Sequence, residues 1–335
     1  MKIAITADPE IPVPPKLYGG IERIIHQLCK ELVTLGHEVT LFAHRESNVP
    51  CRLVKYTGTD QSKSAVLKNG VLITRYVFKE KYDVVHSFGR LAYLSMVLPT
   101  RVRKVMSYQR EPTISQIKLA TKLSRKHSLL FTGCSDYIAK QIRPFAPSYC
   151  VHNFVDTDFY TPIYEVANDA PLVFLGRLEQ IKGAHIAIEV AKKAGKKLVI
   201  AGNIPPEAQH YFNEQVQPHI DDKQITYIGP VNDEQKNRML GKASAFLMPI
   251  LWNEPFGIVM AEALACGTPV IGFSRGSVPE VVLDGVNGYR CSSIDDMVHA
   301  VSQVKNISRS SVREDAEKRF SSKIITDAYL SVYQS

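Results

Sequence analysis

Short runs of apolar residues alternate with longer amphipathic segments along the whole chain. In residues 20–36 the apolar positions recur at helical spacing and a glycine closes the segment, which predicts an amphipathic helix. Residues 184–195 show the same pattern. Between such segments, short apolar runs bounded by turn residues predict buried strands. These runs are 2–7, 38–43, 83–87, 104–108 and 129–134 in the first half, and 171–176, 197–202, 225–229, 245–249 and 269–273 in the second.

This alternation predicts an α/β architecture with two parallel sheets, one in each half of the chain. The length of 335 residues favours two domains, because a single core rarely grows to that size. The polar, non-periodic stretch 156–170 is interpreted as a linker. We therefore expect a first domain at 1–155, a second domain at 171–321, and a helical tail at about 322–335.

Composition and charge limit the compartment and the partners. No transmembrane helix is expected, and Asp8 and Glu10 interrupt the first apolar run before it could form a signal peptide. Six scattered cysteines without a C-x-x-C pair indicate reduced thiols in the cytoplasm and offer no zinc site. Residues 1–155 hold 23 Lys and Arg against 11 Asp and Glu, and the remainder holds 18 against 22, so the net charges are +12 and −4. We expect the basic half to face an anionic partner, with a merely solvated basic surface as the alternative.

Residues 253–272, NEPFGIVMAEALACGTPVIG, hold two glutamates separated by seven residues. Pro255 and Gly257 do not fit a helix interior, so the helix should begin near Gly257 and leave Glu254 in the preceding loop. The first N–H groups of that helix would form an anion site at the carboxyl end of a strand. Glu262, one turn further on, could accept hydrogen bonds from a ribose, and Glu254 from sugar hydroxyls. No G-x-G-x-x-G follows the first strand, which disfavours a dinucleotide oxidoreductase.

This stretch resembles the E-x7-E motif of the retaining GT-B glycosyltransferases of family 4, also called glycosyltransferase group 1. FLGRLEQIKG at 174–183 resembles the diphosphate motif of that family, RGSVPEVVLDGVNGY at 275–289 its Gly-x-x-Pro-Glu segment, and LYGGIER at 17–23 its glycine loop. The motifs follow in the family's order over nearly the whole chain, and the resemblance is nearest to the avilamycin-type group. It implies two Rossmann-like domains that face each other across a cleft, with the C-terminal helix crossing back to the first domain.

The resemblance also implies metal-independent sugar transfer from a nucleotide-sugar. Arg177 and Lys182 would neutralise the departing diphosphate, and Glu254 would bind the sugar. The sequence DTD at 156–158 resembles the metal motif of the other glycosyltransferase class, but it falls in the linker and is rejected as a metal site. The expected catalytic residues are Glu254, Arg177, Lys182 and His86. The expected donor-binding residues are Gly19, Gly20, Gly202, Val231, Phe256, Gly257, Ile258 and Glu262.

One position departs from the pattern of the family. Family members usually have His-x-His at the end of the strand 83–87, and the resemblance assigns the substrate contact to the second histidine. Here His86 matches the first histidine and Phe88 stands in place of the second. We expect the side-chain hydrogen bond to the sugar to be lost, which leaves the donor sugar open. For His86, a functional role and a place in the core both remain open.

The resemblance places the acceptor in the basic first half. Arg110 and Glu111 follow a strand there and are the candidate acceptor contacts, with a structural ion pair as the alternative. Residues 117–130 predict a short basic helix, which could lie on an anionic membrane or pack on the core with a solvated face. Its basic side chains are Lys118, Lys122, Arg125, Lys126 and His127, with Arg101, Arg103 and Lys104 nearby, and its apolar side comprises Ile117, Leu119, Ala120 and Leu123.

We therefore expect a cytoplasmic, retaining glycosyltransferase, peripheral at the inner face of the membrane if its basic half binds lipid. The resemblance implies a front-face route, in which the leaving diphosphate helps to deprotonate the acceptor. That acceptor is a glycan, a small molecule or an anionic lipid-linked compound, and no nucleic acid is expected as a partner. Two alternatives stay open. One is a nucleotide-sugar epimerase on the same fold, and the other is a non-catalytic nucleotide-sugar-binding partner.

Overall fold

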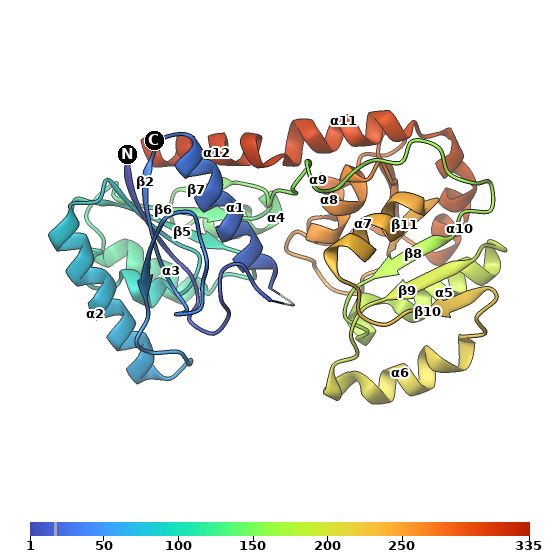
Figure 1. Ribbon diagram of the computed structural model, residues 1–335, viewed down its shortest axis with the longest axis horizontal. Coiled ribbons are helices and arrows are strands. Elements are labelled where there is room, and N and C mark those ends of the chain that lie inside the picture. Colours follow the sequence, from blue (N-terminus) through green and yellow to red (C-terminus); the bar gives the residue numbers. More distant parts are fainter. Residues whose placement is uncertain (17–18) are drawn as a thin grey trace. The chain divides into compact units, whose positions relative to one another are not determined.

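Two parallel β-sheets, each in a unit of its own, organise the chain (Figure 1). The computed structural model describes residues 1–16 and 19–335. Unit 1 comprises residues 1–153 and 322–335, and unit 2 comprises residues 154–321. The α/β class expected from the alternation of apolar runs and amphipathic segments is confirmed.

In the described part of unit 1, the sheet has seven strands in the order β3-β2-β1-β4-β5-β6-β7, and neighbouring strands are parallel. Its central strands are buried almost throughout, which explains why they read as continuous apolar runs. The strands are β1 (Lys2–Thr6), β2 (Glu38–Ala43), β3 (Arg52–Lys55), β4 (Val84–Ser87), β5 (Arg103–Tyr108), β6 (Leu129–Gly133) and β7 (Ser148–Cys150). The helices are α1 (Gly20–Thr34), α2 (Lys63–Glu80), α3 (Ile114–Leu123), α4 (Asp136–Ile142) and α12 (Ser322–Gln334), with a 3-10 turn η1 (Leu91–Leu94).

Unit 2 has a six-stranded parallel sheet in the order β10-β9-β8-β11-β12-β13. The strands are β8 (Leu172–Leu175), β9 (Leu198–Ala201), β10 (Ile225–Tyr227), β11 (Ala245–Met248), β12 (Val270–Phe273) and β13 (Gly288–Cys291). The helices are α5 (Ala184–Lys193), α6 (Gln209–Gln215), α7 (Asp233–Lys242), α8 (Ile258–Ala265), α9 (Val278–Val281), α10 (Ile294–Gln303) and α11 (Arg309–Phe320), with a 3-10 turn η2 (Gln180–Lys182). Among residues 1–16 and 19–335, no helix combines the length and the apolar character needed to span a bilayer.

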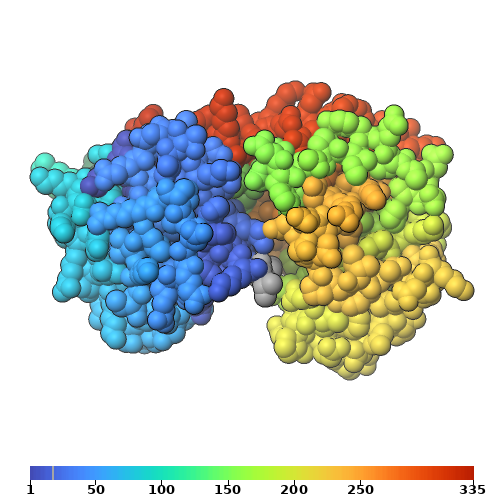
Figure 2. Space-filling view, in the orientation of Figure 1, coloured from blue at the N-terminus to red at the C-terminus, as the bar shows by residue number. Residues whose placement is uncertain are grey.

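The last helix, α12, returns to unit 1 and packs against α1. Its buried face carries Tyr329 and Tyr333, whose ring centroids lie 5.1 Å and 5.5 Å from that of His86. Both chain termini lie at the same end of unit 1 in Figure 1, and Figure 2 shows red C-terminal atoms beside the blue N-terminal half. The expected crossing of the C-terminal helix back to the first domain is confirmed.

The basic helix expected at 117–130 is shorter than its sequence suggested. Helix α3 ends at Leu123, so Arg125 and Lys126 follow the helix and do not lie on it. Leu119 and Leu123, which were assigned to the buried side, are 58% and 54% exposed. The assignment failed because only one narrow stripe of α3 reaches the core, and these two residues lie outside that stripe.

Lys104 was expected near the same basic surface, and this expectation is wrong. Its side chain is buried, and Nζ donates hydrogen bonds to the carbonyl oxygens of Thr100 at 2.8 Å and Leu98 at 3.0 Å. Burial lowers the pKa of Lys104 to about 8. The hydrogen bonds of Lys104 therefore stabilise the turn before β5, and its ammonium group is not available to an anionic partner.

Candidate active site

The carboxyl ends of β8 and β11 form a topological switch point in unit 2. The two strands are neighbours, and the strand order runs away from them in opposite directions. The loops that follow them are joined, because the N–H of Leu251 donates to the carbonyl oxygen of Ile181 at 2.8 Å. Gly183 is packed into the same junction, where a Cβ would lie 2.1 Å from the carbonyl oxygen of Pro249. Open α/β sheets bind their ligands at such a switch point.

Glu254 lies in the loop after β11 and is held by backbone and side-chain contacts. The N–H of Ser277 donates to the carbonyl oxygen of Glu254 at 2.9 Å, and Gly276 is so close that a Cβ there would lie 2.4 Å from that oxygen. The residue is only 9% exposed. Its Oε2 accepts hydrogen bonds from Lys182 Nζ at 2.6 Å and Trp252 Nε1 at 3.1 Å. These contacts leave Oε1 as the oxygen that can accept from a ligand hydroxyl.

Helix α8 begins at Ile258, one residue after the start expected from the sequence. Gly257 caps it with a φ of 71°, a left-handed conformation that glycine adopts without a steric penalty. Among the described residues, no acceptor takes the N–H groups of Gly257, Ile258 or Val259. Three such donors at the positive end of the helix dipole are suited to bind an anion beside Glu254.

The loop after β8 carries the two expected diphosphate ligands. Lys182 ends η2 with its side chain 17% exposed, and its Nζ lies 4.7 Å from the ring centroid of Trp252. Arg177 has a side chain that is 40% exposed and forms an ion pair with Glu179 at 3.0 Å. The structure therefore brings Lys182 and Glu254 into direct contact, while Arg177 lies in the same loop with a different partner.

Glu262 lies on α8 and is 5% exposed. Its Oε1 accepts hydrogen bonds from Tyr160 Oη at 2.8 Å and Lys236 Nζ at 2.5 Å. Its Oε2 is buried and has no hydrogen-bond partner in the part of the chain that the structure describes. An unsatisfied buried carboxylate oxygen is costly, so this atom marks a place where a ligand donor would be stabilising.

The remaining expected donor residues of unit 2 are Gly202, Phe256 and Val231. A Cβ on Gly202 would lie 1.8 Å from the carbonyl oxygen of Gly176, so packing alone requires glycine there. The ring of Phe256 is buried and lies 5.7 Å from that of Phe320. Val231 is half-buried and directly precedes the residue that caps α7.

Gly19 and Gly20 belong to unit 1, at the start of α1. A Cβ on Gly19 would lie 2.6 Å from Cβ of Pro15, so the helix entry is tightly packed. Leu17 and Tyr18, which begin the same motif, lie outside the described residues.

His86 is a core residue in this structure. Its ring is fully buried, with Nδ1 2.6 Å from Tyr333 Oη and Nε2 2.6 Å from Ser107 Oγ. Burial lowers the pKa of His86 to about 3, so the ring is neutral at physiological pH. Both ring nitrogens are occupied, and the expected catalytic role therefore finds no free side-chain atom. Phe88 packs beside it, with ring centroids 4.2 Å apart.

Unit 1 contains a cleft of about 750 Å³ at the carboxyl ends of its central strands. The two expected acceptor residues, Arg110 and Glu111, line it, and Glu111 accepts a hydrogen bond from Tyr137 Oη. Phe88 lines the cleft as well. The first two turns of α2, the turn η1 and the residues just after η1 supply an apolar wall, which comprises Val66, Leu67, Leu91, Ala92 and Met96.

Asp8 and Arg90 add a polar floor to this cleft that the sequence did not reveal. Asp8 Oδ1 lies 3.6 Å from Arg90 Nε, beyond hydrogen-bond distance, and both atoms are buried without a hydrogen-bond partner among residues 1–16 and 19–335. Burial raises the pKa of Asp8, and the positive charges of Arg90 and Arg110 partly oppose that shift. Gln109 Nε2 is also buried, and no described residue is its hydrogen-bond partner. The cleft therefore offers both an acceptor and donors to a polar ligand.

Two family profiles together cover almost the whole chain. The profile described as Glycosyltransferase Family 4 matches residues 18–159, and the profile described as Glycosyl transferases group 1 matches residues 162–321. The chain belongs to glycosyltransferase family 4. As a member of this family it is a retaining, nucleotide-sugar-dependent glycosyltransferase with the GT-B fold. The resemblance inferred from the motifs is confirmed.

Relatives of this glycosyltransferase extend over its full length. Spore coat protein SA of Bacillus subtilis (strain 168) is 25% identical over 385 residues, which covers 100% of this chain and 99% of that protein. The structure of AviGT4, a glycosyltransferase involved in Avilamycin A biosynthesis, matches with a TM-score of 0.72 at 24% identity and covers 99% of this chain and 97% of that one. Anabaena Alr3699/HepE in complex with UDP and glucose matches with a TM-score of 0.75 at 17% identity, over 100% of both chains. At these identities the two structures support the fold alone.

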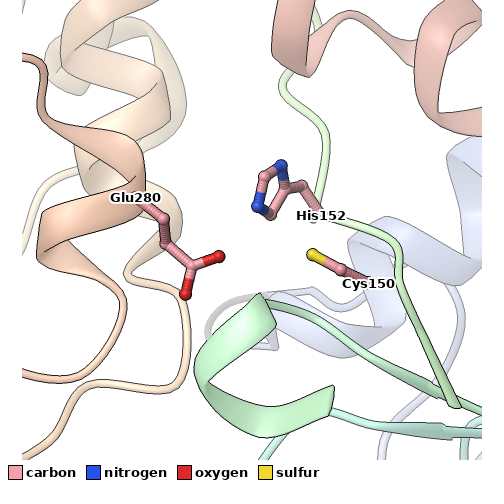
Figure 3. Close-up of side chains that lie close together, drawn as sticks. All are labelled: Cys150, His152 and Glu280. Carbon is pink, nitrogen blue, oxygen red and sulfur yellow. The ribbon is translucent and has the colours of Figure 1, made fainter. Parts of the chain in front are cut away.

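Figure 3 draws Cys150 and His152 of the glycosyltransferase, where the chain leaves β7, together with Glu280 of α9. The first two residues belong to unit 1 and Glu280 belongs to unit 2. The three side chains therefore do not form a metal-ligating group within either unit.

Proposed function

We propose that this glycosyltransferase binds the nucleotide-sugar donor at the switch point of unit 2 and transfers its sugar by a metal-independent, front-face route. The observation that carries the proposal is the ion pair of Glu254 with Lys182 beside the unsatisfied N–H groups at the start of α8. In this arrangement a sugar-binding carboxylate adjoins a site for a diphosphate. The coarser assignment, a nucleotide-sugar glycosyltransferase of family 4, already follows from the sequence profiles.

Each charged residue has a distinct part in the proposed reaction. Oε1 of Glu254 accepts from a sugar hydroxyl, because Lys182 and Trp252 occupy Oε2. Lys182, Arg177 and the first N–H groups of α8 bind the diphosphate and stabilise the negative charge that develops on it. Glu262 Oε2 accepts from the ribose hydroxyls.

The chemical step replaces one bond at the anomeric carbon by another on the same face. The bond from the anomeric carbon to the diphosphate oxygen breaks, and the acceptor hydroxyl oxygen bonds to that carbon. The hydroxyl proton passes to the departing diphosphate oxygen. The positive charges of Lys182 and Arg177 make this departure possible without a divalent cation.

A donor screen tests the proposal. We expect one of UDP-, GDP-, ADP- or dTDP-sugars to raise the melting temperature (Tm) of the protein, because a ligand that binds the folded state stabilises it by mass action. With that donor and a panel of acceptors, release of nucleoside diphosphate should continue unchanged in EDTA. Activity that is lost in EDTA and restored by Mg²⁺ or Mn²⁺ would refute the metal-independent route, and no Tm response to any donor would refute donor binding.

The cleft of unit 1 is the proposed acceptor site. Its floor combines Asp8 and Glu111 with Arg90 and Arg110, and its apolar wall comes from α2 and η1. A cleft with charged and apolar sides fits an amphiphilic acceptor, such as an anionic lipid-linked compound. The +12 charge of residues 1–155 favours an anionic surface nearby.

Helix α3 is the proposed membrane contact of this cytoplasmic enzyme. Exposed Leu119 and Leu123 alternate with exposed Lys118 and Lys122 along it, and its first turn reaches the cleft through Gln116. Apolar side chains interspersed with lysines are typical of helices that lie in the interface of an anionic bilayer. Arg125 and Lys126 follow the helix and are exposed as well, so the four Lys and Arg residues expected here all reach the surface. Nζ of Lys118 also lies 4.5 Å from the ring centroid of Phe145.

Vesicle binding tests this contact. The double variant Lys118→Glu and Lys122→Glu should bind anionic vesicles at least tenfold more weakly than the parent, because each basic residue near an anionic bilayer contributes about 1 kcal/mol. The control carries the same charge change at Lys242 and Lys305, two exposed lysines of unit 2, and should bind like the parent. Equal parental binding to neutral and anionic vesicles, or no binding to either, would remove the membrane contact and leave the catalytic proposal intact.

A further inference from the structure

Two donors from different segments converge on the same oxygen of Glu262. Lys236 Nζ comes from α7 at 2.5 Å, and Tyr160 Oη comes from the segment before β8 at 2.8 Å. Both contact Oε1, so Oε2 is left buried and without a hydrogen-bond partner among the described residues. The Lys236 side chain is itself only 14% exposed, and its Nζ lies 5.3 Å from the ring centroid of Tyr160. The three side chains therefore form one packed group.

The backbone around Tyr160 is fixed from two sides. Asn237, the neighbour of Lys236, accepts from the N–H of Thr161 at 3.2 Å and donates to the carbonyl oxygen of Phe159 at 3.1 Å. Arg313 of α11 donates to the carbonyl oxygen of Tyr160 at 2.5 Å. Tyr160 and Lys236 therefore approach Glu262 from tethered backbone, so their geometry does not depend on a ligand.

A buried carboxylate needs both a counter-charge and hydrogen bonds. In this group the ammonium and the phenol satisfy one oxygen completely, and the carboxyl plane is thereby fixed. A fixed carboxylate with one unoccupied oxygen is suited to a hydroxyl pair, since one oxygen with two lone pairs can accept from both members of a vicinal diol.

We propose that Lys236, assisted by Tyr160, is a positioning residue that balances the charge of Glu262 at Oε1 and so keeps Oε2 available to the ribose diol of the donor. This inference rests on the proposed function, in which Glu262 binds the ribose. In this proposal Lys236 acts through Glu262 and not by a contact of its own with the nucleotide. Its loss therefore weakens binding of ligands that carry the diol and spares ligands that lack it.

A purely structural ion pair between α7 and α8 is the competing explanation, and ligand chemistry separates the two. The probes are the ribonucleoside diphosphate selected by the donor screen, UDP, GDP or ADP, and its counterpart without the 2′- and 3′-hydroxyls. Selection of dTDP alone, which has no 2′-hydroxyl, would already overturn binding of a diol. Affinities are measured by titration calorimetry on the full chain. Lys236→Met keeps the length of the side chain and removes the charge, whereas Lys236→Arg retains the charge. Lys242→Met removes a charge from the exposed last turn of the same helix and is the matched control.

We expect Lys236→Met to weaken binding of the parent diphosphate by about tenfold and to change binding of the deoxygenated counterpart by less than twofold, because the effect passes through a hydroxyl acceptor. Lys236→Arg should recover most of the lost affinity, and Lys242→Met should match the parent. In the transfer reaction, KM for the donor should rise while kcat stays within about twofold. If Lys236→Met does not fold, Tyr160→Phe provides the same comparison, with a loss of about threefold expected because only one uncharged donor to the carboxylate is removed.

Equal losses for both probes would overturn the positioning role, because a structural defect does not distinguish ligands by their hydroxyls. Unchanged affinity for the diphosphate would overturn it too. If no nucleoside diphosphate binds the parent protein, the proposed function itself fails. If the parent binds both probes and the variants lose affinity for both equally, only the positioning role of Lys236 fails.

Discussion

Glu254→Gln should lower kcat for sugar transfer by about a hundredfold or more. The substitution keeps the shape of the side chain but replaces a carboxylate that accepts from Lys182 and Trp252. The amide loses the negative charge that fixes Lys182 and that strengthens the hydrogen bond to the sugar as positive charge develops at the anomeric carbon. The loss should appear in kcat, since this interaction is stronger in the transition state than in the bound donor.

The measurement is the steady-state release of nucleoside diphosphate in the presence of acceptor. Glu234→Gln is the matched control, because Glu234 is an exposed acid in the first turn of α7 of the same unit. That control should turn over at the parental rate. A kcat for Glu254→Gln within threefold of the parent would show that the carboxylate has no part in the transition state.

Lys182→Met should affect both catalysis and stability. The diphosphate loses its nearest buried cation, so transfer should slow by about a hundredfold. Glu254, whose side chain is only 12% exposed, also loses its counter-charge. Removal of one member of a mostly buried ion pair should destabilise unit 2 by about 2 kcal/mol or more, which lowers Tm by roughly 4–8 °C.

The double variant Lys182→Met and Glu254→Gln separates these two effects. With both charges removed, no buried charge is left uncompensated, so Tm should return most of the way to the parental value. Transfer should stay as slow as in the worse single variant, because both groups act on the same transition state. If activity returns together with Tm, Lys182 serves the fold and not the reaction.

The parts of the fold that the sequence predicted are those with clear periodicity. The buried central strands and the helix 20–34 follow their apolar patterns, and the start of α8 follows from Gly257. Helix α2 was missed because apolar side chains lie on all its sides, with Ile73 buried and Phe78 64% exposed. The short edge strands β3 and β7 carry too few buried residues to be recognised.

The candidate site was predictable where it depends on local sequence and unpredictable where it depends on tertiary contacts. A carboxylate before a helix start and a second one inside it can be recognised from Pro255 and Gly257. The partners of Glu262 cannot, because Tyr160 and Lys236 come from separate segments and no spacing rule connects them. His86 finds its partner Tyr333 at a separation of 247 residues. A search of strand ends for charged residues would have found Asp8 and Arg90.

The most direct test of the account compares nucleotide affinity between Glu254→Gln and Glu262→Gln by titration calorimetry. The two variants differ only in which glutamate of the E-x7-E motif loses its charge, and the ligand is the bare nucleoside diphosphate that the donor screen selects. We expect about a tenfold loss of affinity for Glu262→Gln, which removes the ribose acceptor, and less than a twofold change for Glu254→Gln, because the bare diphosphate lacks the sugar that Glu254 binds. Equal losses in the two variants, or a larger loss for Glu254→Gln, would contradict this assignment of the two carboxylates.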